Sequence, residues 1–267
     1  MDIQDKKFVF IGGVHRSGKS ILFRWLTRHS KISGLCNPEA NGKLYRDEGQ
    51  HFQSVYPPGP EYDGPAGFDA SAHLDETSEL ATQDHARRLL ADWEDYWDME
   101  KPVLLENSPP NLVRTRYLQS LFSNTFFIIV LRHPIPVLYE MMRWNADRMD
   151  RMLEHWLSCY ETFEEDIPHL QNLLLVKYED LASDPEREIE RVLDFLGLKR
   201  GRMENNDVKK GENDKHFEVW RKEPLNRYNS FPIPILFRLY CYLRFESRVR
   251  RFGYSLFDLH GVQDVQL

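Results

Sequence analysis

The segment that most constrains the fold is residues 8–20, where an apolar run enters a turn bounded by glycines. Phe8–Ile11 is apolar throughout, and the residues from Gly13 to Ser20 fit the pattern G-x-x-x-x-G-K-S. Apolar residues then recur with helical spacing at Ile21, Leu22, Trp25 and Leu26. This order predicts a buried strand, a tight turn that uses the conformational freedom of glycine, and a helix.

A turn of this kind points successive backbone N–H groups at one place beside a helix N-terminus, and it therefore holds a phosphate oxyanion. Lys19 and Arg16 add positive charge, while Ser17 and Ser20 add hydroxyl donors. The alternative is an ordinary glycine-rich turn between a strand and a helix. We expect the whole turn to hold the anion, that is His15, Arg16, Ser17, Gly18, Lys19 and Ser20.

The overall charge and the cysteine content limit the class of protein. The 267 residues carry a formal net charge of −7, so bulk electrostatics do not favour a nucleic-acid partner, and any anion site has to be a local basic pocket. The three cysteines are widely spaced and indicate neither a disulfide framework nor a metal site. No secretory leader and no apolar run long enough to span a bilayer is seen, so we expect a cytoplasmic location without a transmembrane segment.

The rest of the chain alternates between predicted strands and predicted helices. Besides the strand before the turn, strands are expected at 102–106, 126–131 and 173–176, the last two of them buried. Helices are expected at 19–29, at 77–96 with Thr77 as N-cap, at 112–122, 134–144 and 149–163, at 185–196 with Asp184 as N-cap, and at 235–245. This alternation predicts an α/β fold with a parallel β-sheet flanked by helices and with ligands at the carboxyl ends of its strands. We expect a single domain over 1–267, with a mainly helical C-terminal region at 200–267.

Residues 30–75 differ in character from the elements around them. Proline and glycine recur through this segment, and aromatic residues are interleaved with them, at Tyr45, Phe52, Tyr56, Tyr62 and Phe68. A loop of this length within a compact domain is usually functional or disordered, and its aromatic content argues against disorder. We therefore expect an ordered lid or acceptor-binding loop at 36–75, with a flexible insertion as the alternative.

The residues that end the strands distinguish two kinds of phosphate chemistry. A P-loop NTPase needs an aspartate at the end of an apolar strand to hold magnesium. Here the strongest predicted strand runs into Arg132 and the last one runs into Lys177, while Glu106 and Asp180 are poorly placed for a metal. A cation at a strand end beside the turn is instead what a second anionic group of the ligand requires.

Several segments together resemble the sulfotransferase family. His15–Ser20 after a strand is similar to the family's 5′-phosphosulfate loop. Glu106–Leu112 and Phe126–Pro136 are similar to its central block, in which an arginine at the strand end binds the 3′-phosphate of 3′-phosphoadenosine 5′-phosphosulfate (PAPS). Lys177–Leu181 is similar to a further block, and the resemblance covers residues 8–200 in the family's order.

The resemblance implies a P-loop nucleotide-kinase-like sulfotransferase fold and an enzyme that moves a sulfuryl group from PAPS to a hydroxyl or amine acceptor. The displacement is in line, leaves 3′-phosphoadenosine 5′-phosphate (PAP) and requires no metal, so positioning and charge stabilisation supply most of the barrier reduction. Arg16 and Lys19 would neutralise the leaving group, although the family usually has threonine at the position of Lys19. The acceptor is expected to be a small molecule, a glycan or a peptide hydroxyl.

The resemblance also places further nucleotide contacts along the chain. Arg132 and Tyr178 fall in the matching blocks, and Lys209, Lys210 and Gly211 are similar to a late basic loop that covers the 3′-phosphate in the family. For these three residues, a solvated charge cluster is the alternative.

Glu140 stands where the family has a serine that binds the 3′-phosphate, and we count this position among the nucleotide-binding residues. A carboxylate repels a phosphate unless a cation intervenes. Arg143 lies one helical turn further on and could pair with Glu140, or Tyr139 could donate to the phosphate instead.

A general base is needed to deprotonate the acceptor, and the expected acceptor loop offers two candidates, Glu48 and His51. Related sulfotransferases use a glutamate or histidine from comparable regions, which makes Glu48 the first choice. Glu39 competes by its position, and solvated loop polarity is the alternative for each residue. We interpret His15 as a residue that shapes the loop rather than as the base.

Two other functions stay open on the sequence. One is a P-loop kinase or NTPase that uses Mg-ATP or GTP, because Lys19 follows the NTPase pattern. The other is a catalytically degenerate homologue that binds the nucleotide or a glycan without turnover, which Glu140 suggests.

Overall fold

The computed structural model of the protein describes residues 5–37, 47–57, 72–143, 148–199, 210–222 and 234–261. These residues contain a five-stranded sheet with the order β2-β3-β1-β4-β5. Its strands are β1 (Lys7–Gly12), β2 (Ile32–Gly34), β3 (Val103–Glu106), β4 (Thr125–Leu131) and β5 (Leu173–Lys177). Every neighbouring pair is parallel, so all five strands end at the same edge of the sheet.

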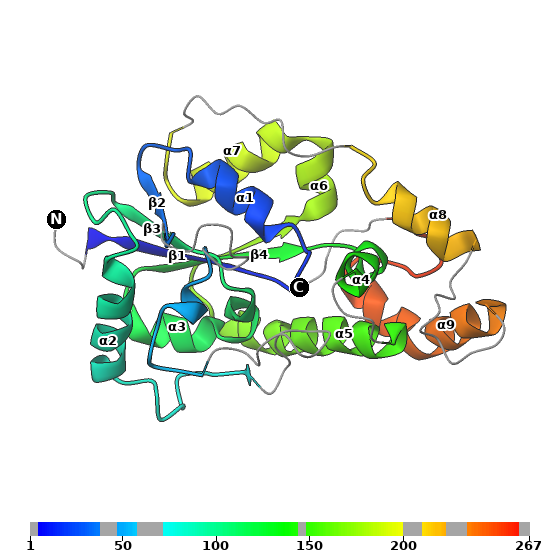
Figure 1. The fold of residues 1–267 in the computed structure, drawn as a ribbon, viewed down its shortest axis with the longest axis horizontal. Coiled ribbons are helices and arrows are strands. Elements are labelled where there is room, and N and C mark those ends of the chain that lie inside the picture. Colours follow the sequence, from blue (N-terminus) through cyan, green and yellow to red (C-terminus); the bar gives the residue numbers. More distant parts are fainter. Residues whose placement is uncertain are drawn as a thin grey trace.

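Helices cover both faces of the sheet (Figure 1). On one face lie α1 (Lys19–Leu26), α6 (Tyr178–Ser183) and α7 (Pro185–Phe195). On the other lie α2 (Gln83–Glu94), α3 (Thr115–Leu121) and α5 (Met149–Asp166). Beyond the end of β4 lie α4 (Pro134–Met142), α8 (Asp214–Lys222) and α9 (Pro234–Arg251), and short 3₁₀ turns form η2 (Gly49–His51), η4 (Pro109–Val113) and η5 (Ile167–His169).

The two faces are built from alternate residues of the same strands, because successive side chains of a strand point to opposite sides. Val9 and Ile11 of β1 pack with the apolar side chains of α1, α6 and α7. Phe8 and Phe10 of β1 point the other way and pack with α2 and α3. Strand β1 therefore contacts both helical layers and is covered on both sides.

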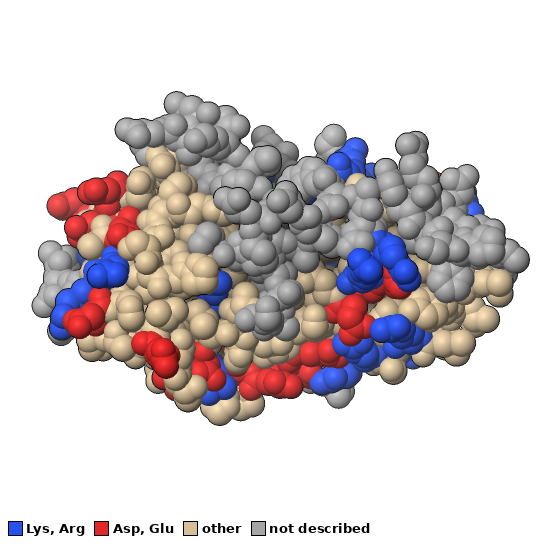
Figure 2. All heavy atoms as spheres, turned by 60° about the horizontal axis from the view of Figure 1, so that its bottom comes forward, with Lys and Arg blue, Asp and Glu red and all other residues tan. Residues whose placement is uncertain are grey.

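Ion pairs hold α9 against α5. The Arg248 guanidinium lies 2.7 Å from a Glu154 carboxylate oxygen and 2.6 Å from Glu161, and Arg251 pairs with Glu164. Figure 2, which brings the bottom of Figure 1 forward, shows basic and acidic side chains next to one another on this face. Charge is thus locally balanced where the C-terminal helix meets the body of the fold.

The predicted α/β fold with a parallel sheet is confirmed. The predicted strands before the turn, at 102–106 and at 126–131 are confirmed as well. Two strand predictions need correction. Ile32–Gly34 forms the edge strand β2 inside the segment that we expected to be a loop from residue 30. The strand at 173–176 was expected to be buried, but β5 is the other edge of the sheet and its first three residues are half-buried.

The helix predicted from Thr77 begins later, at Gln83, and its N-cap is Thr82. The Asp75 carboxylate accepts hydrogen bonds from the backbone N–H and the hydroxyl of Thr77, both at 2.7 Å. This local turn holds Thr77 outside the helix, since an aspartate side chain competes with helical backbone bonds. The Thr82 hydroxyl accepts from the His85 N–H at 3.2 Å, as an N-cap does.

Other helix ends differ by smaller amounts. The first helix stops at Leu26 rather than at residue 29, α5 continues to Asp166, and α9 covers Pro234–Arg251 rather than 235–245. Asp184 is confirmed as an N-cap, because its carboxylate accepts from the Arg187 N–H at 3.2 Å.

The start of α2 can be tested by two matched substitutions. Thr82→Ala removes the cap of α2 and is expected to lower the free energy of unfolding by about 1 kcal/mol. Thr77→Ala removes an exposed turn contact and is expected to change it by less than about 0.5 kcal/mol. Urea unfolding followed by circular dichroism measures both, and a larger loss for Thr77→Ala would contradict the helix start described above.

Candidate functional site

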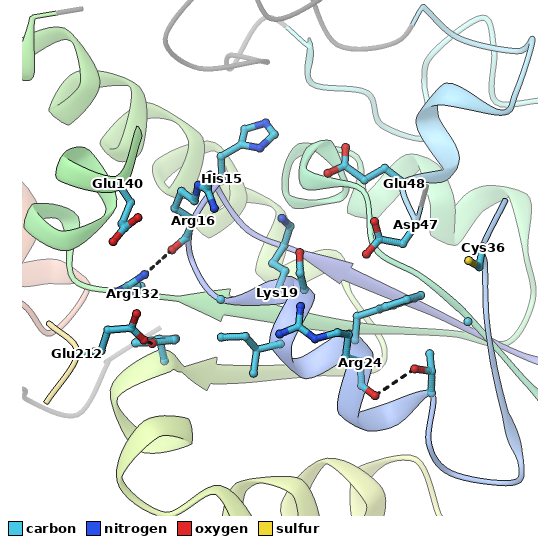
Figure 3. Close-up of a pocket in the computed structure, with 17 residues that line it drawn as sticks. His15, Arg16, Lys19, Arg24, Cys36, Asp47, Glu48, Arg132, Glu140 and Glu212 are labelled. Carbon is cyan, nitrogen blue, oxygen red and sulfur yellow. Dashed lines mark hydrogen bonds between the residues drawn. The ribbon is translucent and has the colours of Figure 1, made fainter. Parts of the chain in front are cut away.

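A cavity of about 690 Å³ lies over the carboxyl edge of the sheet (Figure 3). The turn after β1 and the first part of α1 form its floor. Its lining residues come from six parts of the chain: His15, Arg16, Gly18, Lys19, Ser20, Ile21, Phe23, Arg24 and Thr27; Gly34 and Cys36; Asp47 and Glu48; Arg132 and Glu140; Tyr178; and Glu212. Ligands of parallel α/β folds bind at this edge, next to the strand where the order of connections reverses.

The turn requires glycine at both of its ends, as the sequence pattern predicted. Gly13 has φ +146°, and a Cβ there would lie 2.6 Å from the Val130 carbonyl oxygen of β4. Gly18 has φ +106°, and a Cβ there would lie 2.4 Å from the Tyr178 ring. The turn is therefore packed against both β4 and the residue that follows β5, which leaves no room for a side chain at either position.

Lys19 lies buried in the middle of the cavity, at the start of α1. Burial lowers the pKa of its ammonium group, while the nearby carboxylates of Glu48, Asp47 and Glu106 act in the opposite direction. The first N–H groups of α1 lack intrahelical acceptors, as at every helix start, and they point toward the same place. This part of the cavity can therefore hold an anion.

His15 is buried beside Lys19 in the same turn. Burial moves its pKa well below the usual value, and the positive charges of Lys19 and Arg16 contribute to this shift. The imidazole is thus neutral near pH 7, which agrees with a role in shaping the loop.

Arg132 joins three other segments at the opposite end of the cavity. Its Nη1 donates to the Arg16 carbonyl oxygen at 2.9 Å. Its Nε and Nη2 donate to the Asn213 Oδ1 at 3.0 and 2.7 Å. The guanidinium also lies 4.0 Å from the centre of the Tyr178 ring, a cation–π contact. The plane of the guanidinium is consequently held from both edges and from one face.

A second layer of hydrogen bonds holds Asn213 in turn. Its Nδ2 donates to the Glu179 Oε1 at 2.7 Å, and the same oxygen accepts from the His133 N–H at 3.0 Å. The Tyr254 hydroxyl donates to the other Glu179 oxygen at 2.8 Å. Burial raises the pKa of Glu179, although these donors and Arg132 favour its ionised form.

Glu140 lies at the same end of the cavity as Arg132 and is surrounded by cationic or donor groups. The His216 Nε2 is 2.9 Å from its carboxylate, the Arg143 Nη1 is 3.3 Å away, and the Lys215 Nζ is 3.5 Å away. Burial opposes ionisation, but these three neighbours together lower the pKa of Glu140. The predicted pair with Arg143 is confirmed, and α8 supplies two further partners that the sequence did not indicate.

At the other end, Glu106 connects the end of β3 with η2. One carboxylate oxygen accepts from the Gly49 N–H at 2.7 Å and from the Ser108 hydroxyl at 2.5 Å, and the other accepts from the Asn111 amide at 2.5 Å. The Trp93 indole donates to the Gly49 carbonyl at 2.9 Å. Glu106 thus serves as an acceptor for three buried donors that position η2.

This arrangement places Glu48 at the cavity, directly before η2. Its Oε2 accepts from the Gln50 amide at 2.9 Å and lies 3.5 Å from the His51 Nε2. Asp47 lines the same wall, and burial together with the Glu48 charge raises its pKa. Figure 3 shows both carboxylates on the side of the cavity that faces Lys19.

Comparison with known proteins identifies the family. Residues 9–201 match the sequence profile described as the sulfotransferase family. The chain belongs to this family.

The chain is 28% identical over 199 residues to human heparan sulfate glucosamine 3-O-sulfotransferase 6. The matching region covers 71% of this chain and 52% of that protein. It is 24% identical over 157 residues to bovine sulfotransferase 1A1, covering 50% of this chain and 52% of that protein. This sulfotransferase therefore spans about half the length of the curated relatives it matches. Its fold is similar to the crystal structure of sulfotransferase STF1 from Mycobacterium tuberculosis H37Rv, with a TM-score of 0.50 and 17% identity over 73% of this chain and 68% of that one. The predicted P-loop-like sulfotransferase fold is confirmed.

The cavity brings together most of the predicted site residues of the sulfotransferase. His15, Arg16, Gly18, Lys19, Ser20, Glu48, Arg132, Glu140 and Tyr178 all line it. Ser17 is buried in the turn and His51 is exposed beside Glu48, and neither is among the lining residues.

The late basic loop and one base candidate do not join this group. Lys210 and Gly211 are exposed and are not among the lining residues, and Lys209 and Glu39 lie outside the described residues. Within the described residues, no group of three or more histidine, cysteine, aspartate or glutamate side chains is arranged to hold a metal ion. Among the same residues, no helix combines the length and the apolar character needed to cross a membrane.

Sequence reasoning missed Asn213, Glu212, Lys215 and His216 around Arg132 and Glu140, and Asp47 beside Glu48. The first four follow a segment that reads as polar surface, and only the packing of α8 against α4 brings them to Arg132 and Glu140. Pro134 after His133 marks the start of α4, and this sequence signal indicates where Glu140 lies along the helix. No comparable signal in the sequence indicates the residues that contact Glu140.

The close packing of the turn against Tyr178 leads to a stability prediction. Gly18→Ala is expected to lower the free energy of unfolding by about 3 kcal/mol, because it combines a left-handed backbone with a methyl group pressed against the ring. Gly197→Ala is the control: Gly197 also has a positive φ, but its Cβ would meet only the flexible end of Lys7 at 3.3 Å, so about 1 kcal/mol is expected. Equal losses in denaturant unfolding would contradict the described packing of Gly18.

Proposed function

We propose that this sulfotransferase transfers a sulfuryl group from PAPS to a hydroxyl or amine acceptor by in-line displacement. The observation that carries the proposal is a single cavity with cations at two separate places, Lys19 and Arg16 at the turn and Arg132 at the end of β4. PAPS has two anionic ends, and such a ligand calls for two separated positive sites. Family membership supports the same reaction class.

The turn fits the phosphosulfate end of this donor. Gly13 and Gly18 keep the backbone close to the ligand, and the start of α1 directs N–H groups and its positive dipole end toward an oxyanion. Lys19 is buried and would neutralise charge on the 5′-phosphate oxygen as the bond to sulfur breaks. Arg16 supports the same oxygen from the turn.

Glu48 is proposed as the general base. It lies across the cavity from the turn, and the Glu106 network fixes the backbone that follows it. Glu48 would take the proton from the acceptor while the acceptor oxygen or nitrogen attacks sulfur and the nucleotide leaves as PAP. The name of the human relative indicates a glucosamine acceptor for that protein; for this chain we propose a small molecule, a glycan or a peptide hydroxyl.

Ligand-induced stabilisation tests the donor. PAP is expected to raise the melting temperature in proportion to its affinity, because a ligand that binds the folded state stabilises it. Mg-ATP at the same concentration is expected to raise it less. A shift with Mg-ATP and none with PAP would favour the P-loop kinase or NTPase alternative, and PAP binding without transfer of labelled sulfate would favour a degenerate homologue.

The role of Arg132 is tested by comparing two nucleotides. Arg132→Ala is expected to weaken PAP binding by about 1.5–3 kcal/mol, the scale of a lost charge-assisted hydrogen bond. Adenosine 5′-phosphosulfate lacks the 3′-phosphate, so its binding is expected to change little. Titration calorimetry measures both, with Arg132→Lys as a control that keeps the charge. Equal losses for the two nucleotides would contradict the assignment.

The role of Glu48 is tested by rate. Glu48→Gln is expected to lower the transfer rate about 10²- to 10⁴-fold while PAP affinity is kept, because only proton removal is lost. Asp47→Asn is the matched control on the same wall and is expected to keep most of the activity. Full activity in Glu48→Gln would move the role of base to His51, Asp47 or Glu39.

A further inference from the structure

The segment from Glu212 to His216 packs around Arg132 and Glu140, and Glu212 lines the cavity itself. Asn213 holds the Arg132 guanidinium, and the Glu212 carboxylate accepts from the Tyr178 hydroxyl at 2.6 Å. The His216 Nε2 donates to the Glu140 carboxylate at 2.9 Å. Successive residues of one short segment therefore contact each side chain that lines this end of the cavity.

Lys215 is not among the lining residues, but it contacts two carboxylates that are. Its Nζ lies 3.5 Å from a Glu140 oxygen and 3.6 Å from a Glu212 oxygen. Both carboxylates line the cavity, and Figure 3 shows them on either side of Arg132. Lys215 therefore bridges two negative groups at the edge of the place where the second anion of the ligand would lie.

These carboxylates pose an electrostatic problem for a doubly charged ligand. A phosphate bound by Arg132 would lie near the Glu140 and Glu212 carboxylates. Neighbouring like charges repel each other strongly where water is partly excluded. The repulsion falls if a cation turns from the carboxylates to the phosphate. Lys215 is suited to this exchange, because its side chain is 53% exposed and its stem is flexible.

The other nearby cations fit this role less well. Arg143 pairs with Glu140 from just after the end of α4, whereas Lys215 reaches both Glu140 and Glu212. Lys210 is exposed, and within the described residues it forms no ion pair with either carboxylate. His216 is buried and stacks on the Tyr139 ring, and burial lowers its pKa even though Glu140 opposes this.

We propose that Lys215 is a nucleotide-binding residue, which exchanges Glu140 and Glu212 for the second phosphate of the donor, and that Glu140 limits the affinity for that phosphate. This inference rests on the proposed function and adds to it a specific cation and a specific competing carboxylate. The exchange makes and breaks no covalent bond. It replaces one ion pair with another of higher charge.

The first experiment measures PAP and adenosine 5′-monophosphate by titration calorimetry on the full chain. Lys215→Gln is expected to weaken PAP about 3- to 10-fold, the range for a partly exposed ion pair, and to leave the monophosphate unchanged. Lys222→Gln is the matched control, because Lys222 lies on the same helix and pairs with Glu218 at 3.3 Å in an exposed position. It is expected to change neither affinity.

The second experiment removes the competing charge. Glu140→Gln keeps a group that can hydrogen-bond to His216, and it is expected to tighten PAP about 3- to 10-fold with no change for the monophosphate. Glu140→Ser, a smaller replacement, is expected to act in the same direction. Thermal unfolding of each variant shows that the fold is kept.

The outcomes separate this inference from the proposed function. If PAP binds and Lys215→Gln behaves as wild type, or if both nucleotides weaken equally, Lys215 has no role at the second phosphate and the inference is overturned. If Glu140→Gln weakens PAP, Glu140 instead accepts hydroxyl groups of the ribose, which also overturns it. Wild-type protein that binds neither PAP nor PAPS would overturn the proposed function as well.

Discussion

The arrangement of this protein depends on the hydrogen bonds and the stacking contact of the Arg132 guanidinium. They connect the end of β4 with the turn after β1, with Tyr178 after β5 and with Asn213 before α8. These segments are far apart in sequence, and a planar group with donors on both edges can join them at one point. The Tyr178 ring is itself packed against Gly18, so the turn and the arginine are positioned by the same aromatic side chain.

A buried carboxylate has the corresponding role on the other side of the turn. Glu106 accepts hydrogen bonds from Gly49, Ser108 and Asn111, and in this way it attaches η2 to the end of β3. Burial raises its pKa, so the network needs all three donors to keep the carboxylate stable away from water. The turn is thus flanked by a cationic network at β4 and an anionic one at β3. This polarity gives the cavity two chemically different ends.

The protein carries a net charge of −7, and yet the proposed donor is strongly anionic. An anionic donor can still bind, because Lys19, Arg16 and Arg132 are concentrated in one cavity, where burial strengthens the interaction of a cation with a ligand. Lys19 lies near the Asp47 carboxylate, and Arg132 donates to the Arg16 carbonyl.

Much of the fold and of one half of the site followed from local patterns in the sequence. The apolar run at 8–11, the two glycines and the helical spacing after Ser20 are short-range signals, and they correctly predicted β1, the turn and α1. Arg132 was found because it ends the most apolar strand. Strand β2, the start of α2 and the edge position of β5 were not found, since a short strand and an aspartate turn depend on neighbours distant in sequence. What only the tertiary structure decided is the set of partners: Asn213, Lys215 and His216 reach Arg132 and Glu140 because α8 packs against α4, and no pattern within a single segment encodes that contact.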